Sequence, residues 1–587
     1  MRFTAILLTL LTGTALYSAD DRHKKLNDII AEEWEFELRS QPESATVFGD
    51  DRYNDKVSDL SAAAIQANIN ESRRYLQRLE EVDTTGLSDQ DQLNKKLLVR
   101  NLRMGLKSFD LKLHEMPIDQ FSGFHLQVPL MVALTPFHTT KDYENYIARL
   151  RQWPGTFDQV MELARAGERD GLMPPKHLLE KVVEQSRAIG AGALASDSPF
   201  LQPAQKFPDS VAPAEQARLR KAIHDAVENG IVPAYQRFTN FVKEDYAPKG
   251  RLDDGESALP NGQEIYRFLI AQSTTTTMTA DEIHELGLRQ VAETEAAMTA
   301  LAKKQGYADL KSFQQAVKND PKNHPTSRED ILDHYRKYTD GMYGKVGELF
   351  GRMPKARLTV VPVESYREKE AADAEYQQGS PDGSRKGRVA VNTGDFQHRT
   401  LDEIEATAYH EGIPGHHFQI SIAQELQSLP AFRQHAFYTA YTEGWGLYSE
   451  RLGKEVGFYG DPESEYGRLS GEMLRSIRLV VDTGVHAKHW TRQQMVDYFH
   501  QHSTSDEPSI QAEVDRYIAM PAQALAYKIG QLKILEIQQR AQSELGAKFD
   551  IKGFHDELLG GGALPLDVLD GRVSAWIAAQ KSGAKPQ

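Results

Sequence analysis

Apolar residues recur at three- and four-residue spacing along most of the chain, which is the pattern of amphipathic helices. Clear examples are residues 26–38, 93–113 and 157–164. Capping boxes, in which a threonine precedes a glutamate or glutamine by three residues, mark helix starts. Such pairs are Thr279 with Glu282, Thr326 with Glu329, Thr400 with Glu403, and Thr491 with Gln494. The pattern predicts a mainly α protein.

One region has the alternating, β-branched pattern of strands instead. The segments RLTVVPVE (357–364) and GRVAVN (387–392) predict two strands joined by a polar stretch. We therefore expect a small β element at residues 357–392. An exposed strand edge can bind an extended peptide through main-chain hydrogen bonds, which makes Asn392 a substrate-binding candidate. The alternative is a purely structural hairpin.

The chain has 587 residues, which exceeds the size at which one hydrophobic core stops growing. We expect one bilobal body with an N-terminal helical lobe at 20–270 and a catalytic helical lobe at 271–587. The net charge is −15 and the isoelectric point is about 5.7. This acidic balance argues against nucleic-acid binding, which needs a basic surface. The sequence leaves the oligomeric state open.

The first residues, MRFTAILLTLLTGTALYSAD, resemble a secretory signal peptide, with a basic residue, an apolar run and small residues near Ala19. We expect residues 1–19 to be removed and the protein to be exported, to the periplasm or the medium. No later segment has the 18 or more apolar residues of a membrane span. The chain has no cysteine, so we expect neither disulfides, nor thiolate ligands, nor a lipoprotein.

Candidate chemistry is concentrated at residues 409–419, which read YHEGIPGHHFQ. In the zinc-hydrolase motif H-E-x-x-H, two histidines one turn apart bind the metal and the glutamate acts as base. Here His410 and Glu411 are present, but four residues separate Glu411 from His416. In a straight helix His410 and His416 would point about 120° apart, and His417 would lie about 10 Å along the axis.

The inserted Gly-Ile-Pro-Gly segment favours a break in the helix, since proline opposes a regular helix and glycine adopts conformations that other residues avoid. A loop there would bring His416, rather than His417, to the metal beside His410. His417 would then support a ligand or face the substrate. If the segment continued as straight helix, a shared zinc site would be excluded.

The third ligand is expected from the segment YTEGWGLYSE (441–450). Glu443 is the first choice, because Gly444 and Gly446 permit close approach of the backbone. Glu450, two turns later, is expected to hold a histidine next to the ligands rather than to bind the metal itself. His410, His416 and Glu443 would bind one Zn2+ and leave a fourth position for water, with Glu411 as general base.

Four segments carry a family resemblance: HEGIPGHHFQ, YTEGWGLYSERLG, VDTGVHAKHW and RYIAMPAQALAYKIG. Together they resemble the bacterial domain-of-unknown-function 885 family, grouped with the gluzincin-like metallopeptidases. The resemblance implies a zincin-like bilobal helical fold with a deep cleft. This implied fold is similar to that of the angiotensin-converting-enzyme, thimet-oligopeptidase and carboxypeptidase Taq families. Those families have an uninterrupted H-E-x-x-H, which this chain does not.

The resemblance also implies a tyrosine after the third ligand that stabilises the oxyanion, and Tyr527 and Tyr517 match equally well. Residue type adds two candidates: Arg516 as a clamp for a substrate carboxylate, and His486 as a donor to a substrate carbonyl. For each of these four residues a purely structural role is the alternative.

The expected function is an exported zinc-dependent hydrolase of short peptides, because a deep cleft would exclude folded proteins. Two alternatives stay open. One is a metallo-amidase that acts on cell-wall or modified peptides. The other is a non-catalytic peptide-binding protein with a degenerate metal site. The sequence has neither the G-x-S-x-G motif of serine hydrolases nor a Walker phosphate loop.

Overall fold

The structure is a computed structural model that describes residues 18–583, apart from 366–367, 369–370, 382 and 384. Nearly all of the predicted signal peptide therefore lies outside the described residues. Among the residues that are described, no helix is long and apolar enough to cross a membrane.

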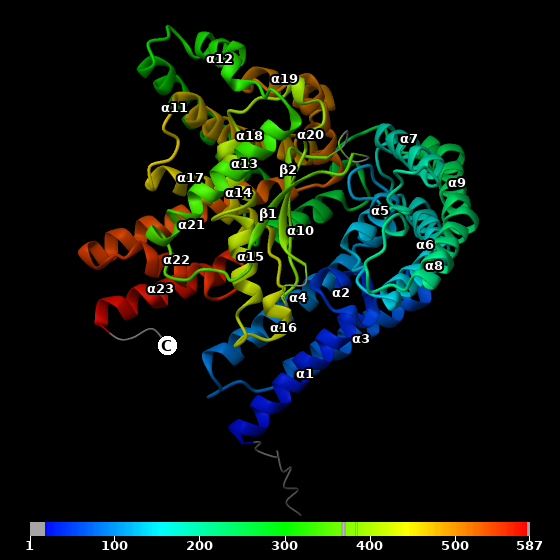
Figure 1. The fold of residues 1–587 in the computed structure, drawn as a ribbon. Helices are drawn as coiled ribbons and strands as arrows, with labels where there is room; N and C mark the ends of the chain where they lie inside the picture. The colour runs from blue at the N-terminus through cyan, green and yellow to red at the C-terminus, as the bar shows by residue number, and fades with distance from the viewer. Residues whose placement is uncertain (1–17, 366–367, 369–370, 382, 384, 584–587) are drawn as a thin grey trace, which may run out of the picture.

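The described chain is mainly helical, as predicted (Figure 1). The three periodic segments at 26–38, 93–113 and 157–164 fall on α1, α4 and α6 respectively, and α4 ends at Asp110. The helices of the first half are α1 (Ala19–Ser40), α2 (Pro42–Phe48), α3 (Ala62–Glu80), α4 (Asp89–Asp110), α5 (Phe124–Leu134), α6 (Thr140–Asp170), α7 (Lys176–Gly192), α8 (Pro213–Ala226), α9 (Val232–Phe241), α10 (Gly262–Thr274), α11 (Ala280–Lys304) and α12 (Leu310–Asn319).

The second half holds the candidate chemistry. Its helices are α13 (Arg328–Tyr343), α14 (Ile404–Glu411), α15 (His416–Gln424), α16 (Ala431–Gln434), α17 (Thr439–Glu455), α18 (Pro462–Ala487), α19 (Arg492–His502), α20 (Glu507–Ala519), α21 (Ala526–Leu545), α22 (Ile551–Leu559) and α23 (Leu566–Ser582).

Two of the four predicted capping boxes are present, at Thr279 and Thr491. The other two predictions are wrong. Ser327, not Thr326, caps α13. Helix α14 begins only at Ile404, after a turn, so Thr400 does not cap it. The helix that carries His410 is therefore one turn shorter than the sequence pattern predicts.

The small β element is confirmed, but it is not a hairpin. Strands β1 (Leu358–Pro362) and β3 (Gly387–Val391) are the predicted pair, and they run parallel. A third strand that the sequence analysis missed, β2 (Ala374–Gln377), pairs antiparallel with β3 and gives the order β1-β3-β2. Strand β2 is thus an edge strand, and it packs against α14.

The hydrophobic cores join distant parts of the chain. The largest core combines residues of α1, α3 and α4 with residues of α14, α15, α17 and α21–α23. A second core lies within residues 118–247, in the group of helices α5–α9 at the right of Figure 1. The division into lobes at residue 270 stays a prediction, but the first core shows that the N-terminal helices pack directly on the helices that carry the site.

Candidate metal centre

The Gly-Ile-Pro-Gly insert interrupts the helix, as predicted. Helix α14 ends at Glu411, and α15 begins at His416. A Cβ atom on Gly415 would lie 1.9 Å from the carbonyl oxygen of His410, so this position requires glycine. The indole of Trp445 donates a hydrogen bond to the carbonyl of Pro414 at 2.8 Å, which fixes the loop against α17.

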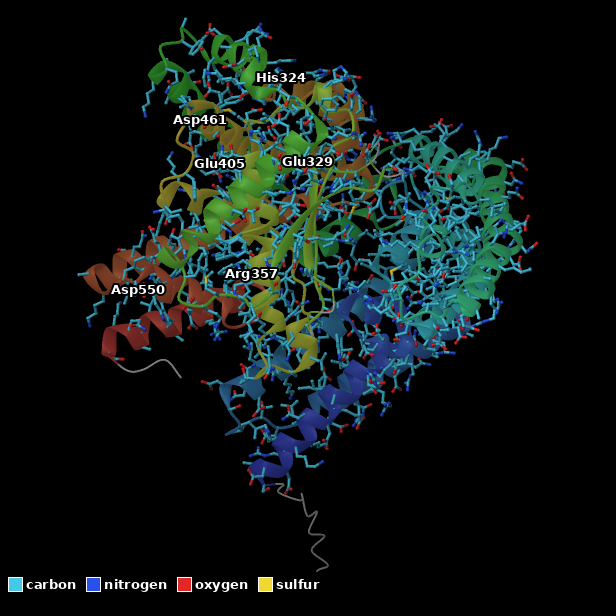
Figure 2. All side chains as sticks on the ribbon, viewed as in Figure 1. His324, Glu329, Arg357, Glu405, Asp461 and Asp550 are labelled. Atoms are coloured by element: carbon cyan, nitrogen blue, oxygen red, sulfur yellow. The ribbon has the colours of Figure 1, made fainter. Side chains whose placement is uncertain are left out.

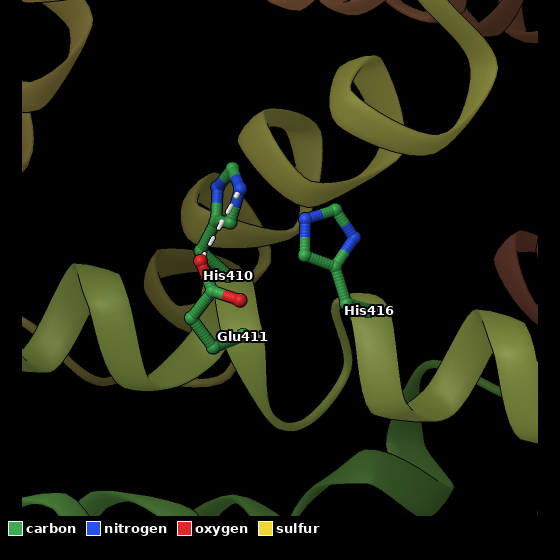
Figure 3. A group of neighbouring side chains, drawn as sticks. All are labelled: His410, Glu411 and His416. Carbon is green, nitrogen blue, oxygen red and sulfur yellow. Dashed lines mark ion pairs between the residues drawn. The ribbon is translucent and has the colours of Figure 1, made fainter. Parts of the chain in front are cut away.

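His410 and His416 consequently meet across the loop. Figure 3 shows them projecting from two separate helices toward one another, with Glu411 beside His410. Their ring centroids are 4.7 Å apart. His410, Glu411 and His416 each offer one ligand atom, and these atoms lie within 4.8 Å of one another.

Glu443, on α17, lies close to both histidines. Its Oε2 lies 3.6 Å from Nε2 of His410 and 3.3 Å from Nε2 of His416. Two ligand atoms that are each ~2 Å from a tetrahedral zinc ion are about 3.3 Å apart. The predicted approach of Glu443 to both His410 and His416 is confirmed, and these two distances fit a zinc ion. That they bind zinc stays a prediction.

Gly446 allows α17 to approach this closely. A Cβ atom there would lie 2.8 Å from both Cε1 and Nε2 of His410 and 3.1 Å from Cε1 of His416. Side-chain atoms cannot approach one another so closely without a shift of the rings. The close approach predicted from the glycines of this segment is therefore confirmed at Gly446.

Two carboxylates orient the residues of α14. Oε1 of Glu450 lies 2.8 Å from Nδ1 of His410, so Glu450 does hold a histidine, but that histidine is the candidate ligand His410. Glu405, labelled in Figure 2, accepts hydrogen bonds from the Tyr409 hydroxyl and from the backbone N–H of Tyr459, both at 3.0 Å. The carboxylate of Glu450 fixes the ring of His410. The carboxylate of Glu405 ties α14 to the segment after α17.

Replacing Glu450 with glutamine is expected to weaken zinc binding by about 10- to 100-fold, the usual effect of losing the partner of a metal-binding histidine. Zinc affinity is measured by competition with a chromogenic chelator. Glu455→Gln, at the exposed end of the same helix, is the matched control and should bind zinc like the native protein. Equal affinity in Glu450→Gln would show that this hydrogen bond does not hold the ligand.

Without a metal, protons balance the charges of this cluster. Burial lowers the pKa of His410, but the carboxylates of Glu443 and Glu450 outweigh it and raise this pKa to about 10. Burial raises the pKa of Glu443, but His416 and His410 outweigh it and hold that pKa well below its usual range. A cation that binds here would displace the proton from Nε2 of His410.

Glu411 faces the cluster and also the edge of the sheet. One oxygen lies 4.0 Å from Nε2 of His410, and the other accepts a hydrogen bond from the backbone N–H of Tyr376 at 2.8 Å. Its side chain is 14% exposed and that of Glu443 is 13% exposed, so solvent reaches both. The deep cleft itself stays a prediction.

The two tyrosines that matched equally well in sequence differ in the structure. The ring of Tyr527 stacks near that of His410, with centroids 6.3 Å apart and an angle of 22°. Tyr517 is fully buried; its hydroxyl donates to Glu513 and accepts from Nε of Arg478 at 2.9 Å. Tyr527 is therefore the oxyanion-stabilising candidate, and Tyr517 is corrected to a structural residue.

Three further predicted site residues are engaged elsewhere. His486 accepts from the N–H of Glu256 at 3.1 Å and donates to the carbonyl of Tyr517 at 3.0 Å. Burial lowers its pKa to about 3. Both ring nitrogens are thus used, which contradicts a role as donor to a substrate carbonyl.

Asn392 and His417 are likewise structural. Asn392 is buried, and its amide donates to the carbonyls of Glu368 and Ala371 at 2.8 and 2.9 Å, which holds these two residues beside the end of β3. The buried ring of His417 lies 3.1 Å from the hydroxyl of Tyr376 and 3.2 Å from the carbonyl of Ala356. It supports the sheet and does not face the ligands, so both substrate-binding predictions are corrected.

Arg516 does lie near the centre. Its Nη2 donates to the hydroxyl of Tyr527 at 3.0 Å. Sequence reasoning missed its neighbour Arg478, which lies 4.7 Å above the ring of Tyr527. The available signal was an arginine within the apolar run of α18, flanked by Ile477 and Leu479.

The chain belongs to the family described as bacterial protein of unknown function (DUF885), whose model matches residues 42–573. A solved structure of "the putative lipoprotein from Colwellia psychrerythraea" is 27% identical, with a TM-score of 0.89, and the match covers 95% of this chain and 99% of that one.

A second structure, "a putative lipoprotein of unknown function from Shewanella oneidensis", is 18% identical, with a TM-score of 0.68 and coverage of 94% and 99%. It shows the fold alone. No curated protein matches the chain. The relationship to metallopeptidases stays a prediction.

Proposed function

We propose that the protein is a zinc-dependent peptidase that cleaves short peptides. The observation that carries this proposal is the meeting of His410, His416 and Glu443 at distances that fit one zinc ion, with Glu411 beside them. Two imidazoles and one carboxylate are a donor set of catalytic zinc sites, which keep a position for water. When bound, zinc would supply a Lewis acid and lower the pKa of that water to about 7.

Glu411 is the proposed general base. It lies next to a ligand, is partly exposed and is a carboxylate, so it can take a proton from water and deliver it to the leaving nitrogen. The hydroxyl of Tyr527 is the proposed donor to the developing oxyanion. Its stacking near His410 and its bond from Arg516 hold it at the rim of the cluster.

The edge of β2 supports the choice of a peptide as substrate. The N–H of Asn392 donates a hydrogen bond to the carbonyl of Asp373. In an antiparallel pair, residues whose backbone groups bond the neighbouring strand alternate with residues whose backbone groups point away from it. By the register, Ala374 and Tyr376 direct their N–H and C=O groups away from β3. The Tyr376 N–H already reaches Glu411, so a peptide added to this edge would pass the base and the metal ligands.

The non-catalytic alternative loses its main support in the structure. It rested on the insert between Glu411 and His416, which would separate the histidines in a straight helix. The insert loops out and the histidines meet. We also propose that the protein is exported, from its signal-like N-terminus and from the description of the Colwellia psychrerythraea relative as a putative lipoprotein.

Purified protein is expected to contain about one zinc per chain, the content of a single catalytic site. It should cleave short unmodified peptides, and a chelator should stop the cleavage until zinc is restored. Metal content is measured by elemental analysis and cleavage by mass spectrometry. Native protein that neither holds nor takes up zinc would exclude the site. Cleavage of modified cell-wall peptides alone would favour the amidase.

A further inference from the structure

Helix α5 is apolar on all sides. Only two of its eleven residues, His125 and Gln127, are polar. A helix at the edge of a single core normally has a polar outer face, whereas a helix that is apolar all round is covered on both sides. One side of α5 is accounted for, because Val128, Met131 and Val132 pack in the second core. The other side calls for a separate explanation.

Leu126, Leu130 and Ala133 form that other side, which we call the α5 face. At 3.6 residues per turn, the two leucines each point about 160° away from Val128. Both leucines are half-buried, so solvent reaches them. Neither belongs to any hydrophobic core found among the described residues. The α5 face is therefore an apolar strip that the fold of the chain does not cover.

The C-terminal end of α5 is attached to the small sheet. The carbonyl of Leu134 accepts a hydrogen bond at 3.0 Å from Nη1 of Arg385, which lies in the connection between β2 and β3. The carbonyl of Ala133 accepts one at 3.5 Å from Nη2 of Arg388, on β3. In Figure 1, α5 lies on the side of its helix group that is nearer the strands.

The N-terminal end of α5 is attached to α20, near the candidate oxyanion donor. In the loop before the helix, the side chain of Gln120 donates to the carbonyl of Asp515 at 3.0 Å. The ring of Phe121 lies 5.2 Å from the guanidinium of Arg516, which bonds the hydroxyl of Tyr527. Helix α5 thus runs from the sheet to α20. Because the second core lies behind it, the α5 face is the side turned toward these elements.

The spacing of the two leucines matches that of an extended peptide. Residues four apart on a helix are separated by about 6 Å along its axis. In an extended chain every second side chain points to the same side, and such side chains are about 7 Å apart. A peptide added to the edge of β2 would therefore present alternate side chains at nearly the spacing of Leu126 and Leu130.

We propose that Leu126 and Leu130 bind two apolar side chains of the peptide substrate, at positions separated by one residue. This inference rests on the proposed peptidase function and gives its substrate class as short peptides with alternate apolar residues. Such contacts would remove apolar surface from water on both partners, which is favourable. The α5 face would determine which peptides bind and take no part in the chemistry.

Binding tests this independently of cleavage. The probes are N-terminally labelled alanine-based hexapeptides with two leucines at alternate positions, two adjacent leucines, or two serines. The host is the full-length Glu411→Gln protein, loaded with zinc, which should bind without cleaving. We expect the alternate-leucine peptide to bind at least about tenfold more tightly than the serine peptide, the effect of burying leucine side chains. Adjacent leucines should bind more weakly than alternate ones, because only one of them can point to the α5 face. Fluorescence anisotropy measures all three affinities.

Adding Leu126→Gln or Leu130→Gln to this host should reduce the preference for the alternate-leucine peptide, and the double variant should remove it. Leu288→Gln, at a position of α11 that is 38% exposed, is the control and should preserve it. Circular dichroism checks that each variant is folded.

Equal binding of the leucine and serine peptides in the host, or no binding of any, overturns the proposal, whether or not the native protein cleaves peptides. So does a preference that survives in the double variant, or adjacent leucines that bind as tightly as alternate ones. Selective binding by a native protein that hydrolyses none of the peptides would support the α5 face and exclude the proposed hydrolysis, so the two failures are distinct.

Discussion

Replacing Glu411 with glutamine is expected to reduce peptide hydrolysis by about a hundredfold to ten-thousandfold, the contribution of a positioned general base. Glutamine has nearly the same shape, but it cannot take up a proton. Glu411 is not needed to complete the proposed ligand set. The carboxylate oxygen Oε2 of Glu443 already lies 3.6 Å from Nε2 of His410 and 3.3 Å from Nε2 of His416. Zinc content should therefore stay at the native level.

His410→Ala provides the contrast. It removes a ligand and also the hydrogen bond between His410 and Glu450, so both zinc and hydrolysis should be lost. The pair of variants separates base from ligand by elemental analysis and initial-rate measurements on the same peptide. If Glu411→Gln instead lost zinc, Glu411 would be a ligand in place of Glu443. If it retained full activity, the base would be another residue.

The sequence identified this centre because its signals are local. Helical spacing excludes His410 and His416 as partners in a straight helix, and the glycines and proline between them indicate a break. The structure places the break at Gly412–Gly415, as those residue types require. Glu443 and Glu450 were found for the same reason: they lie two turns apart on one helix, and both face His410.

The residues that sequence reasoning misplaced depend on tertiary packing. Tyr517 and Tyr527 lie in one motif and are alike in type, and only the packing of α20 and α21 places one at His410 and the other at Glu513. His486 and Asn392 are polar residues of kinds found in active sites, yet both satisfy buried backbone groups. A single sequence cannot separate these roles, because burial decides them.

Strand β2 shows a different limit. Its four residues, Ala374–Gln377, contain a single strong strand former, Tyr376, and no β-branched residue. The strand forms because β3 offers it an edge. The parallel pairing of β1 with β3 could not be predicted from the sequence either, because two nearby strands joined by a polar stretch favour an antiparallel hairpin. The strand that the sequence analysis missed is the one that contacts the candidate site, since the N–H of Tyr376 in β2 donates to Glu411.

Replacing Gly446 with alanine is expected to impair the metal centre with little effect on folding. The added methyl group would lie 2.8 Å from the ring of His410 and 3.1 Å from that of His416, so both rings must move. A shift of about 1 Å in such a site can reduce activity by about a hundredfold. The protein itself should remain folded, since alanine is favoured over glycine within a helix by about 1 kcal/mol, and the clash involves side-chain rings only.

Zinc affinity, initial rate and thermal unfolding of Gly446→Ala are compared with those of Gly571→Ala. Gly571 lies within α23, and a Cβ atom there meets nothing within 4 Å, so this control gains the same helical preference without a clash. It should bind zinc normally. Native zinc affinity and rate in Gly446→Ala would mean that α17 does not lie against the two imidazoles, and the ligand role of Glu443, which depends on that approach, would fail with it.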